Sequence, residues 1–198
     1  MRTITSRADA FDRALTQIKA VEVRPEFELD EAPAPSRLAP SAVALTIEMA
    51  DPDDASASGR FVLLHDPDGV DELEGSFRAV VFVRAALEAD LVDDPLLHDV
   101  GWSWVTESIA GAGAHVTQLG GTVTRTSGRS FGTMLDRPSD GFVEIRASWT
   151  PVESDEGEVL DSMSAHVTAW LDLIAQTAGL PPLPQGVTHV GTRRRNRS

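Results

Sequence analysis

Residues 42–49 read Ala-Val-Ala-Leu-Thr-Ile-Glu-Met, and every second residue is a large apolar one. Val43, Leu45, Ile47 and Met49 therefore share one side of an extended chain, while smaller or polar residues share the other. This period of two predicts a β-strand that has one face in a hydrophobic core.

Two further strands are predicted after this one. Residues 61–64 are uninterruptedly apolar, which is typical of a strand covered on both faces. Residues 77–84 alternate again, with arginines at both ends of the polar side. The connectors 51–59 and 66–76 are rich in Asp, Gly and Pro and are predicted to be hairpin loops. Short connections favour an antiparallel meander.

The second half of the chain predicts three more strands, over residues 115–126, 129–135 and 142–149. Gly120-Gly121 interrupts the first of them and predicts a β-bulge. Helices are predicted over residues 7–20, about 94–111 and about 159–178. The order α-βββ-α-βββ-α predicts an α+β domain of antiparallel sheet(s) with the helices packed on one face.

The chain is interpreted as a single domain over residues 1–184. Residues 30–41 hold three prolines and are expected to form an extended connector inside it. Residues 185–198 contain four arginines close to the end and are expected to form a disordered, arginine-rich tail. At 198 residues the chain can bury a core without a disulfide or metal.

The charge of the chain restricts its partners. The formal net charge is −14, and outside the last six residues 13 basic residues face 31 acidic ones, a balance of −18. Such a surface repels phosphate backbones and anionic lipid. We therefore expect the folded domain to bind neither nucleic acid nor a membrane. The first 13 residues carry acidic groups and no apolar run, so a cytoplasmic location is expected.

The residue types needed for common chemistry are scarce. There is no cysteine, and the five histidines are far apart in sequence, with none at a metal-ligand spacing from another. No phosphate loop or nucleophile elbow is present in the sequence. The sequence therefore predicts no cofactor, no metal and no catalytic residues, and it favours a non-catalytic protein.

Seven residues are candidates for an interaction surface: His65, Asp66, Arg78, Arg84, Trp102, Arg125 and Arg146. The pair at 65 and 66 follows a strand and resembles half of a catalytic dyad, although a histidine bonded to its own turn is commoner. The four arginines fall on strand faces that otherwise look polar. They could form an anion site, or pair with carboxylates such as Glu48 and Glu144.

Trp102 is the aromatic candidate for contact with a partner. It is out of phase with Trp104 by about 200° on a helix, so the two cannot share one face. Trp104 has the phase of its aliphatic neighbours and is expected in the core. We expect Trp102 to be exposed, where tryptophan is typical of interfaces.

Several short segments, in their order and spacing, carry a family resemblance. They are Val-Arg-Pro-Glu-Phe-Glu-Leu at 23–29, Leu-Leu-His-Asp-Pro at 63–67, Trp-Ser-Trp at 102–104, Glu-Ile-Arg-Ala-Ser-Trp-Thr at 144–150 and Gly-Leu-Pro-Pro at 179–182. Over about residues 10–182 the chain resembles a family of actinobacterial proteins of unknown function, which implies no activity. The element order also looks like that of small acidic secretion chaperones, which dimerise and hold extended partner segments, although a shared fold is weak evidence of function.

Two hypotheses follow from the sequence. The first is a non-catalytic, chaperone-like module that binds a protein partner or a second copy of itself, using edge strands and Trp102. The alternative is a small-molecule binder or enzyme with a pocket of His65, Asp66 and the arginines. A flat surface favours the first hypothesis and a deep lined cavity favours the second.

Overall fold

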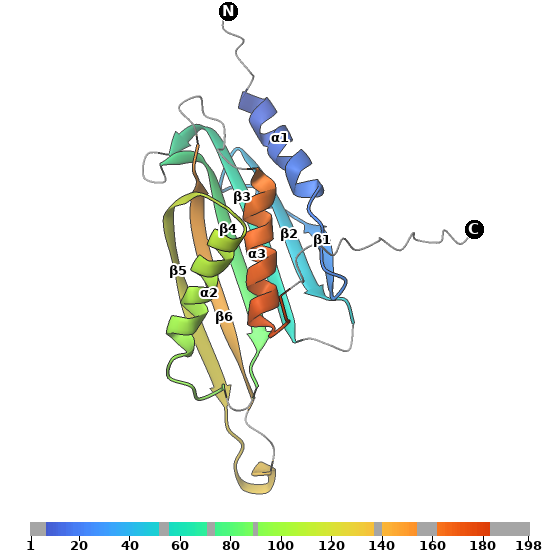
Figure 1. Cartoon of the computed structure of the whole chain (residues 1–198), viewed down its shortest axis with the longest axis vertical. Helices are drawn as coiled ribbons and strands as arrows, with labels where there is room; N and C mark the ends of the chain where they lie inside the picture. The colour runs from blue at the N-terminus through green and yellow to red at the C-terminus, as the bar shows by residue number, and fades with distance from the viewer. Residues whose placement is uncertain are drawn as a thin grey trace, which may run out of the picture.

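The computed structural model describes residues 7–51, 56–70, 74–88, 91–136, 140–153 and 162–182. Within them the chain forms three α-helices and a six-stranded antiparallel sheet, so the predicted α+β class is confirmed (Figure 1). The elements are α1 (Arg7–Lys19), β1 (Phe27–Ala32), β2 (Ser41–Met49), β3 (Ala57–Val70), β4 (Gly75–Ala86), α2 (Leu97–Gly111), β5 (Val116–Gly128), β6 (Asp140–Pro151) and α3 (Met163–Thr177).

The strands lie in the order β1-β2-β3-β4-β6-β5. The first four form a meander, in which each strand pairs with the next one in sequence. After β4 the chain passes through α2 to the far edge of the sheet, and β6 then returns between β4 and β5. The two predicted meanders are therefore one continuous sheet.

All three helices lie on the same face of the sheet, as predicted (Figure 1). That face is lined by the alternate apolar residues of the strands, for example Phe61, Val81 and Ile145, which are almost completely buried. The apolar side of α3 packs on them, because its residues recur every three to four positions. This one-sided covering leaves the other face of the sheet without a described helix.

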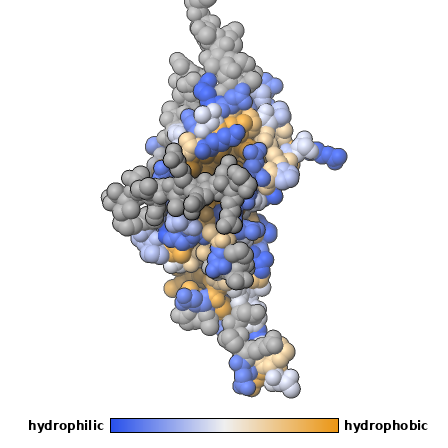
Figure 2. Space-filling model, turned by 90° about the vertical axis from the view of Figure 1, so that its right-hand side faces the viewer, coloured by the Kyte–Doolittle hydropathy of each residue, from blue (hydrophilic) through white to orange (hydrophobic). Residues whose placement is uncertain are grey.

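Several elements differ from the sequence prediction. β3 (Ala57–Val70) extends into both expected hairpin loops, 51–59 and 66–76, and β4 begins inside the second of them, at Gly75. β1 was not predicted, and it occupies the first three residues of the expected connector, 30–41, by pairing with β2 from Phe27 opposite Met49. The strand predicted over 129–135 is wrong. This segment contains a single 3-10 turn, Gly132–Met134, at the tip of the β5–β6 hairpin, where the sheet offers it no neighbour. The tip projects from the body and carries hydrophobic and hydrophilic residues side by side (Figures 1 and 2).

Local irregularities follow the sequence more closely. The predicted bulge is confirmed by a register shift of β5 against β6 between Thr117 and Gly120. The last helix also ends next to the predicted residue 178, where Gly179 has a φ of +70° and the Leu180 N–H donates to the Ala175 carbonyl oxygen at 2.9 Å. The predicted tail, 185–198, lies outside the described residues. Among the described helices, none is long and apolar enough to cross a membrane.

Candidate functional site

The candidate site is the face of the sheet opposite the helices, called here the open face. On β3, β4 and β6 its residues are Ser58, Arg60, Val62, Leu64, Arg78, Val80, Phe82, Arg84, Phe142, Glu144, Arg146, Ser148 and Thr150. These positions hold four arginines and one glutamate, although the whole chain has 31 acidic and 17 basic residues. The middle of this face is therefore a basic area on an acidic protein.

Aromatic and cationic side chains alternate across the open face. Phe82 lies opposite Arg60 on one neighbouring strand and opposite Arg146 on the other. The guanidinium carbon of Arg146 is 5.4 Å from the centre of the Phe82 ring, and that of Arg84 is 3.7 Å from the Phe142 ring. Each such cation–π contact is worth about 0.5–1 kcal/mol at an exposed site. The contacts hold these arginine side chains along the sheet.

Arg78 is the most constrained of these arginines. Its Nη1 donates to the Gln118 carbonyl oxygen at 2.9 Å and to Thr150 Oγ1 at 3.1 Å, and its Nη2 donates to Ser148 Oγ at 2.6 Å. All three acceptors are neutral, and no carboxylate of the described residues forms an ion pair with it. Partial burial lowers the pKa of Arg78, because desolvation disfavours its charge.

The hydrogen bonds of Arg78 leave capacity for an external ligand. A guanidinium has five N–H groups, and the described acceptors use three of them. An anion that entered from solvent could accept from the remaining N–H groups and would balance a charge that the described neighbours do not balance. Among the described residues, two N–H groups of Arg78 therefore have no acceptor.

The other arginines of the open face are tied more loosely. Arg146 forms an ion pair with Glu144 at 3.1 Å, but its side chain is exposed, so this pair contributes little to stability. Arg60 donates from Nη2 to the Pro33 carbonyl oxygen at 2.7 Å and so connects β3 to the segment after β1. Arg84 is exposed above Phe142.

The structure places three of the seven predicted residues, Arg78, Arg84 and Arg146, on the open face, where Arg78 and Arg84 are six positions apart on β4. Arg125 lies on the opposite face, where it pairs with Val143 in the β5–β6 register. Its Nη1 donates to the Asp94 carbonyl oxygen at 2.7 Å, which fastens the segment before α2 to β5. Its role in the described structure is therefore to hold the fold together.

His65 is not accessible to a partner. It lies on the helix-covered face with 3% of its surface exposed, and its ring stacks 4.3 Å from Phe77 and 5.7 Å from Phe11 of α1. Burial lowers the pKa of His65, and the charges of Glu153 and Asp66 only partly oppose this shift. Asp66 accepts a hydrogen bond from the Asp68 N–H at 3.0 Å, which stabilises the turn after β3.

The buried imidazole predicts a pH-dependent stability. Because the pKa of His65 is lower in the folded state, the unfolded chain binds a proton first as the pH falls below about 6.5. The contribution of the neutral His65 to the free energy of unfolding is complete above that pH. It is lost on acidification, by at most about 1.4 kcal/mol per pH unit. The free energy of unfolding, measured with urea at several values between pH 7.5 and 5.5, should fall less steeply with decreasing pH for His65→Phe than for the parent chain. His98→Gln, at an exposed position of α2, is the matched control, and equal slopes for all three proteins would contradict this assignment.

Trp102 and Trp104 of α2 are both half-buried, so the predicted contrast between an exposed and a core tryptophan is not observed. Trp102 lies over Gly121 of β5, where a Cβ atom would be 3.0 Å from its Cζ3. The missing side chain of the glycine makes room for the indole. Trp102 thus contributes to packing between α2 and the edge of the sheet.

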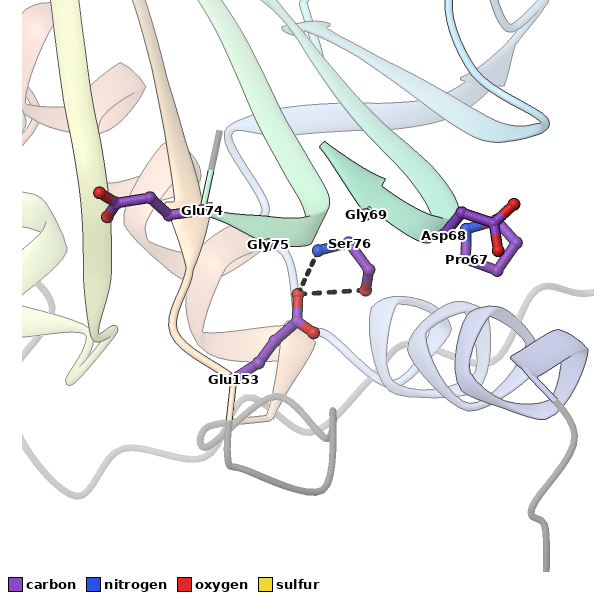
Figure 3. Close-up of a pocket in the computed structure, with 7 residues that line it drawn as sticks. All are labelled: Pro67, Asp68, Gly69, Glu74, Gly75, Ser76 and Glu153. Atoms are coloured by element: carbon purple, nitrogen blue, oxygen red, sulfur yellow. Dashed lines mark hydrogen bonds between the residues drawn. The ribbon is translucent and has the colours of Figure 1, made fainter. Parts of the chain in front are cut away.

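A shallow hollow of about 370 Å³ lies beside the β3–β4 hairpin (Figure 3). It is lined by Pro67, Asp68, Gly69, Glu74, Gly75, Ser76 and Glu153. Glu153 Oε1 accepts from the Ser76 N–H at 2.6 Å, the Ser76 hydroxyl at 3.1 Å and the Phe77 N–H at 3.3 Å. Neither His65 nor any arginine lines this hollow, so it is not the pocket that the alternative hypothesis requires.

Arg60 and Phe82 were not among the predicted site residues. The uninterrupted apolar run 61–64 predicts a strand covered on both faces, and this pattern conceals the alternation that begins at Ser58. The strand starts at Ala57, and Arg60, Val62 and Leu64 are only half-buried. The period of two, taken from the start of this longer strand, places Arg60 on the same face as the other arginines.

The fold and the site define an α+β protein with a sheet covered on one side and a basic open face. The chain belongs to the family described as "Protein of unknown function (DUF3000)", whose model matches residues 7–188. The expected membership in a family without known function is confirmed. No curated protein and no solved structure matches this chain.

Proposed function

We propose that this protein is a non-catalytic, chaperone-like interaction module whose open face binds an extended acidic segment of a protein partner. The observation that carries the proposal is Arg78, a half-buried cation held by neutral oxygen atoms with N–H groups left for another acceptor. Arg60 and Arg146, both opposite Phe82, and Arg84 extend the positive charge along the same face, four to six positions from Arg78 on β4. Complementary charge guides such encounters and fixes their register.

The apolar residues of the open face support a peptide rather than a simple ion as the ligand. Val80 is 38% exposed at the centre of the face, and Val62 lies opposite it on β3. Residues i, i+2 and i+4 of an extended segment face the same side, so a segment that has carboxylates and apolar residues in turn at these positions can contact both the arginines and the valines. Both kinds of contact come from the same surface.

The edges of the sheet are poorer templates for a partner strand than the sequence suggested. β1 has only six residues, carries Glu28, Asp30 and Glu31, and is followed by Pro33. β5 is interrupted by its bulge between Thr117 and Gly120. Charges, proline and bulges are the features with which natural sheets block edge pairing. This favours docking on the face over strand addition.

The remaining parts of the proposal concern partner class and compartment. The net charge of −14 repels extended polyanions and supports a folded domain that binds neither nucleic acid nor an anionic membrane, whereas a short acidic segment meets the local positive charge of the open face. We place the protein in the cytoplasm, on the sequence expectation given above. Both statements agree with a partner that is itself a protein.

Arg78→Gln is expected to weaken binding of a defined acidic peptide by about 10- to 100-fold, since a hydrogen bond to a charged group contributes about 1.5–3 kcal/mol. The probe is a fluorescent twelve-residue peptide (a design length) of repeated Glu-Ser-Phe-Ser, which places Glu and Phe on the same side of an extended chain, and the measurement is fluorescence anisotropy. Loss of the guanidinium removes both the charge and the free N–H groups, which is why the effect exceeds that of a remote charge.

The matched control is Arg37→Gln, which removes one positive charge at an exposed position between β1 and β2. It should bind the probe nearly as well as the parent chain. A peptide of repeated Lys-Ser-Phe-Ser should not bind. Equal losses in the two arginine variants, or equal affinity for the two peptides, would exclude the open face as the binding site. Circular dichroism melts establish that each variant is folded.

A further inference from the structure

Exposed large apolar side chains gather at one end of the molecule. Among the described residues eight such side chains are exposed by more than about a third of their surface, and six of them come from two segments. The finger, residues 129–136 at the tip of the β5–β6 hairpin, carries Phe131, Met134 and Leu135, which are 71%, 45% and 65% exposed. The shoulder, residues 91–100 between β4 and the first turn of α2, carries Leu91, Leu96 and Val100.

The finger and the shoulder are neighbours at the same end of the fold. Two contacts connect the segment after β4 to the base of the hairpin: the Leu87 N–H donates to the Gly141 carbonyl oxygen at 2.9 Å, and Arg125 Nη1 donates to that of Asp94 at 2.7 Å. The finger extends beyond both of them, away from the body of the molecule (Figure 1). It therefore cannot cover the shoulder of its own chain.

The shoulder is acidic, and the finger offers it an exposed arginine. The shoulder has exposed carboxylates at Asp93 and Asp99, and within the described residues neither of them forms an ion pair. The finger has an exposed Arg129, whose guanidinium carbon is 5.8 Å from the Phe131 ring. Asp136 at the other end of the finger is also exposed, so the finger has no net charge, and the complementarity is local, between Arg129 and the carboxylates of the shoulder. An apolar centre with charges of complementary sign is a common arrangement of protein interfaces.

We infer that this end is a homodimer interface, in which the finger of each copy packs on the shoulder of the other. A two-fold axis makes such a contact reciprocal, because residue i touches residue j and residue j touches residue i. One chain carries the finger and the shoulder next to each other. A second copy can therefore cover the shoulder with its finger and the finger with its shoulder. The interface lies away from Arg78 and leaves the open face accessible, so it is independent of the proposed function.

The molar mass in solution tests this inference, by size-exclusion chromatography with light scattering. The parent chain is expected to have twice its chain mass of 21.2 kDa. The double variant Phe131→Asp, Leu135→Asp is expected to have the mass of one chain and an unchanged circular dichroism spectrum. Leu38→Asp is the matched control, because Leu38 is equally exposed in the connection between β1 and β2, and it should stay dimeric.

The pairing of the two surfaces is tested by disulfide trapping, since the chain has no cysteine. A mixture of the single variants Met134→Cys and Leu96→Cys should give a disulfide-linked dimer under mild oxidation, in much higher yield than either variant alone. A monomeric parent chain, a double aspartate variant that stays dimeric, or no cross-link in the mixture would each overturn the inference. Binding of a different protein to the finger, without self-association of the chain, would also overturn the inference.

Discussion

Replacing Trp170 with alanine is expected to lower the free energy of unfolding by about 3–5 kcal/mol. The indole is completely buried between α3 and the sheet, with its ring centre 5.7 Å from that of Phe61. Its Nε1–H donates to the Phe82 carbonyl oxygen at 3.3 Å. The truncation leaves a cavity and removes this hydrogen bond. A domain of ordinary stability has about 5–15 kcal/mol in total, so the loss is a large fraction.

Urea unfolding followed by far-ultraviolet circular dichroism measures this effect. Trp102→Ala is the matched control, because it removes the same side chain from a half-buried position on α2. Its expected cost is smaller, about 1–2 kcal/mol, within the range of ordinary substitutions. If the two variants were equally destabilised, the assignment of Trp170 as the central contact of α3 would be wrong.

The elements that the sequence predicted correctly are those whose pattern is local. The buried side of α3 follows from apolar residues three and four positions apart, and β2 and β4 follow from strict alternation. β1 has only Phe27 and Leu29 as large apolar residues, and its existence depends on pairing with β2, which no local pattern shows. Residues 129–135 look like a strand because three large apolar residues lie within them, but they extend past the end of the sheet and have no strand to pair with.

The positions of the candidate site residues divide in the same way: local alternation determines some of them, and contacts with distant residues determine the others. Alternation places Arg78, Arg84 and Arg146 on one face without knowledge of the fold. The position of Arg125 depends on the bulge. Counted from Val116, position 125 falls on the open side, but the shift between Thr117 and Gly120 reverses the alternation and turns it toward the helices.

Contacts with distant residues decide the remaining candidates. His65 is inaccessible because α1, more than fifty residues earlier in the chain, brings Phe11 against its ring. The sequence around position 65 does not predict that contact. The neutral acceptors of Arg78 likewise come from β5 and β6, far from it in sequence. The sequence could propose these residues, whereas their accessibility depends on packing between distant segments.

Gly59→Ala is expected to destabilise the fold by about 3 kcal/mol, at the upper end of the cost of overpacking a core. Gly59 lies in a central strand, on the covered face beneath α3. A Cβ atom there would lie 2.5 Å from Ile174 Cδ1, 2.9 Å from the Phe82 carbonyl oxygen and 3.2 Å from Trp170 Nε1. The isoleucine can rotate away, but the carbonyl belongs to the backbone of β4, which is paired on both sides.

Gly120→Ala is the matched control, because it makes the same change in the same sheet at a position where a Cβ atom meets nothing within 4 Å. Its effect should stay within about 0.5 kcal/mol, as for other substitutions away from packed features. Equal effects in urea unfolding would mean that α3 lies farther from β3 than the structure places it. A loss confined to Gly59→Ala identifies close approach as the reason for glycine at this position, since the same atom that blocks the methyl group, the Phe82 carbonyl oxygen, accepts the hydrogen bond of Trp170.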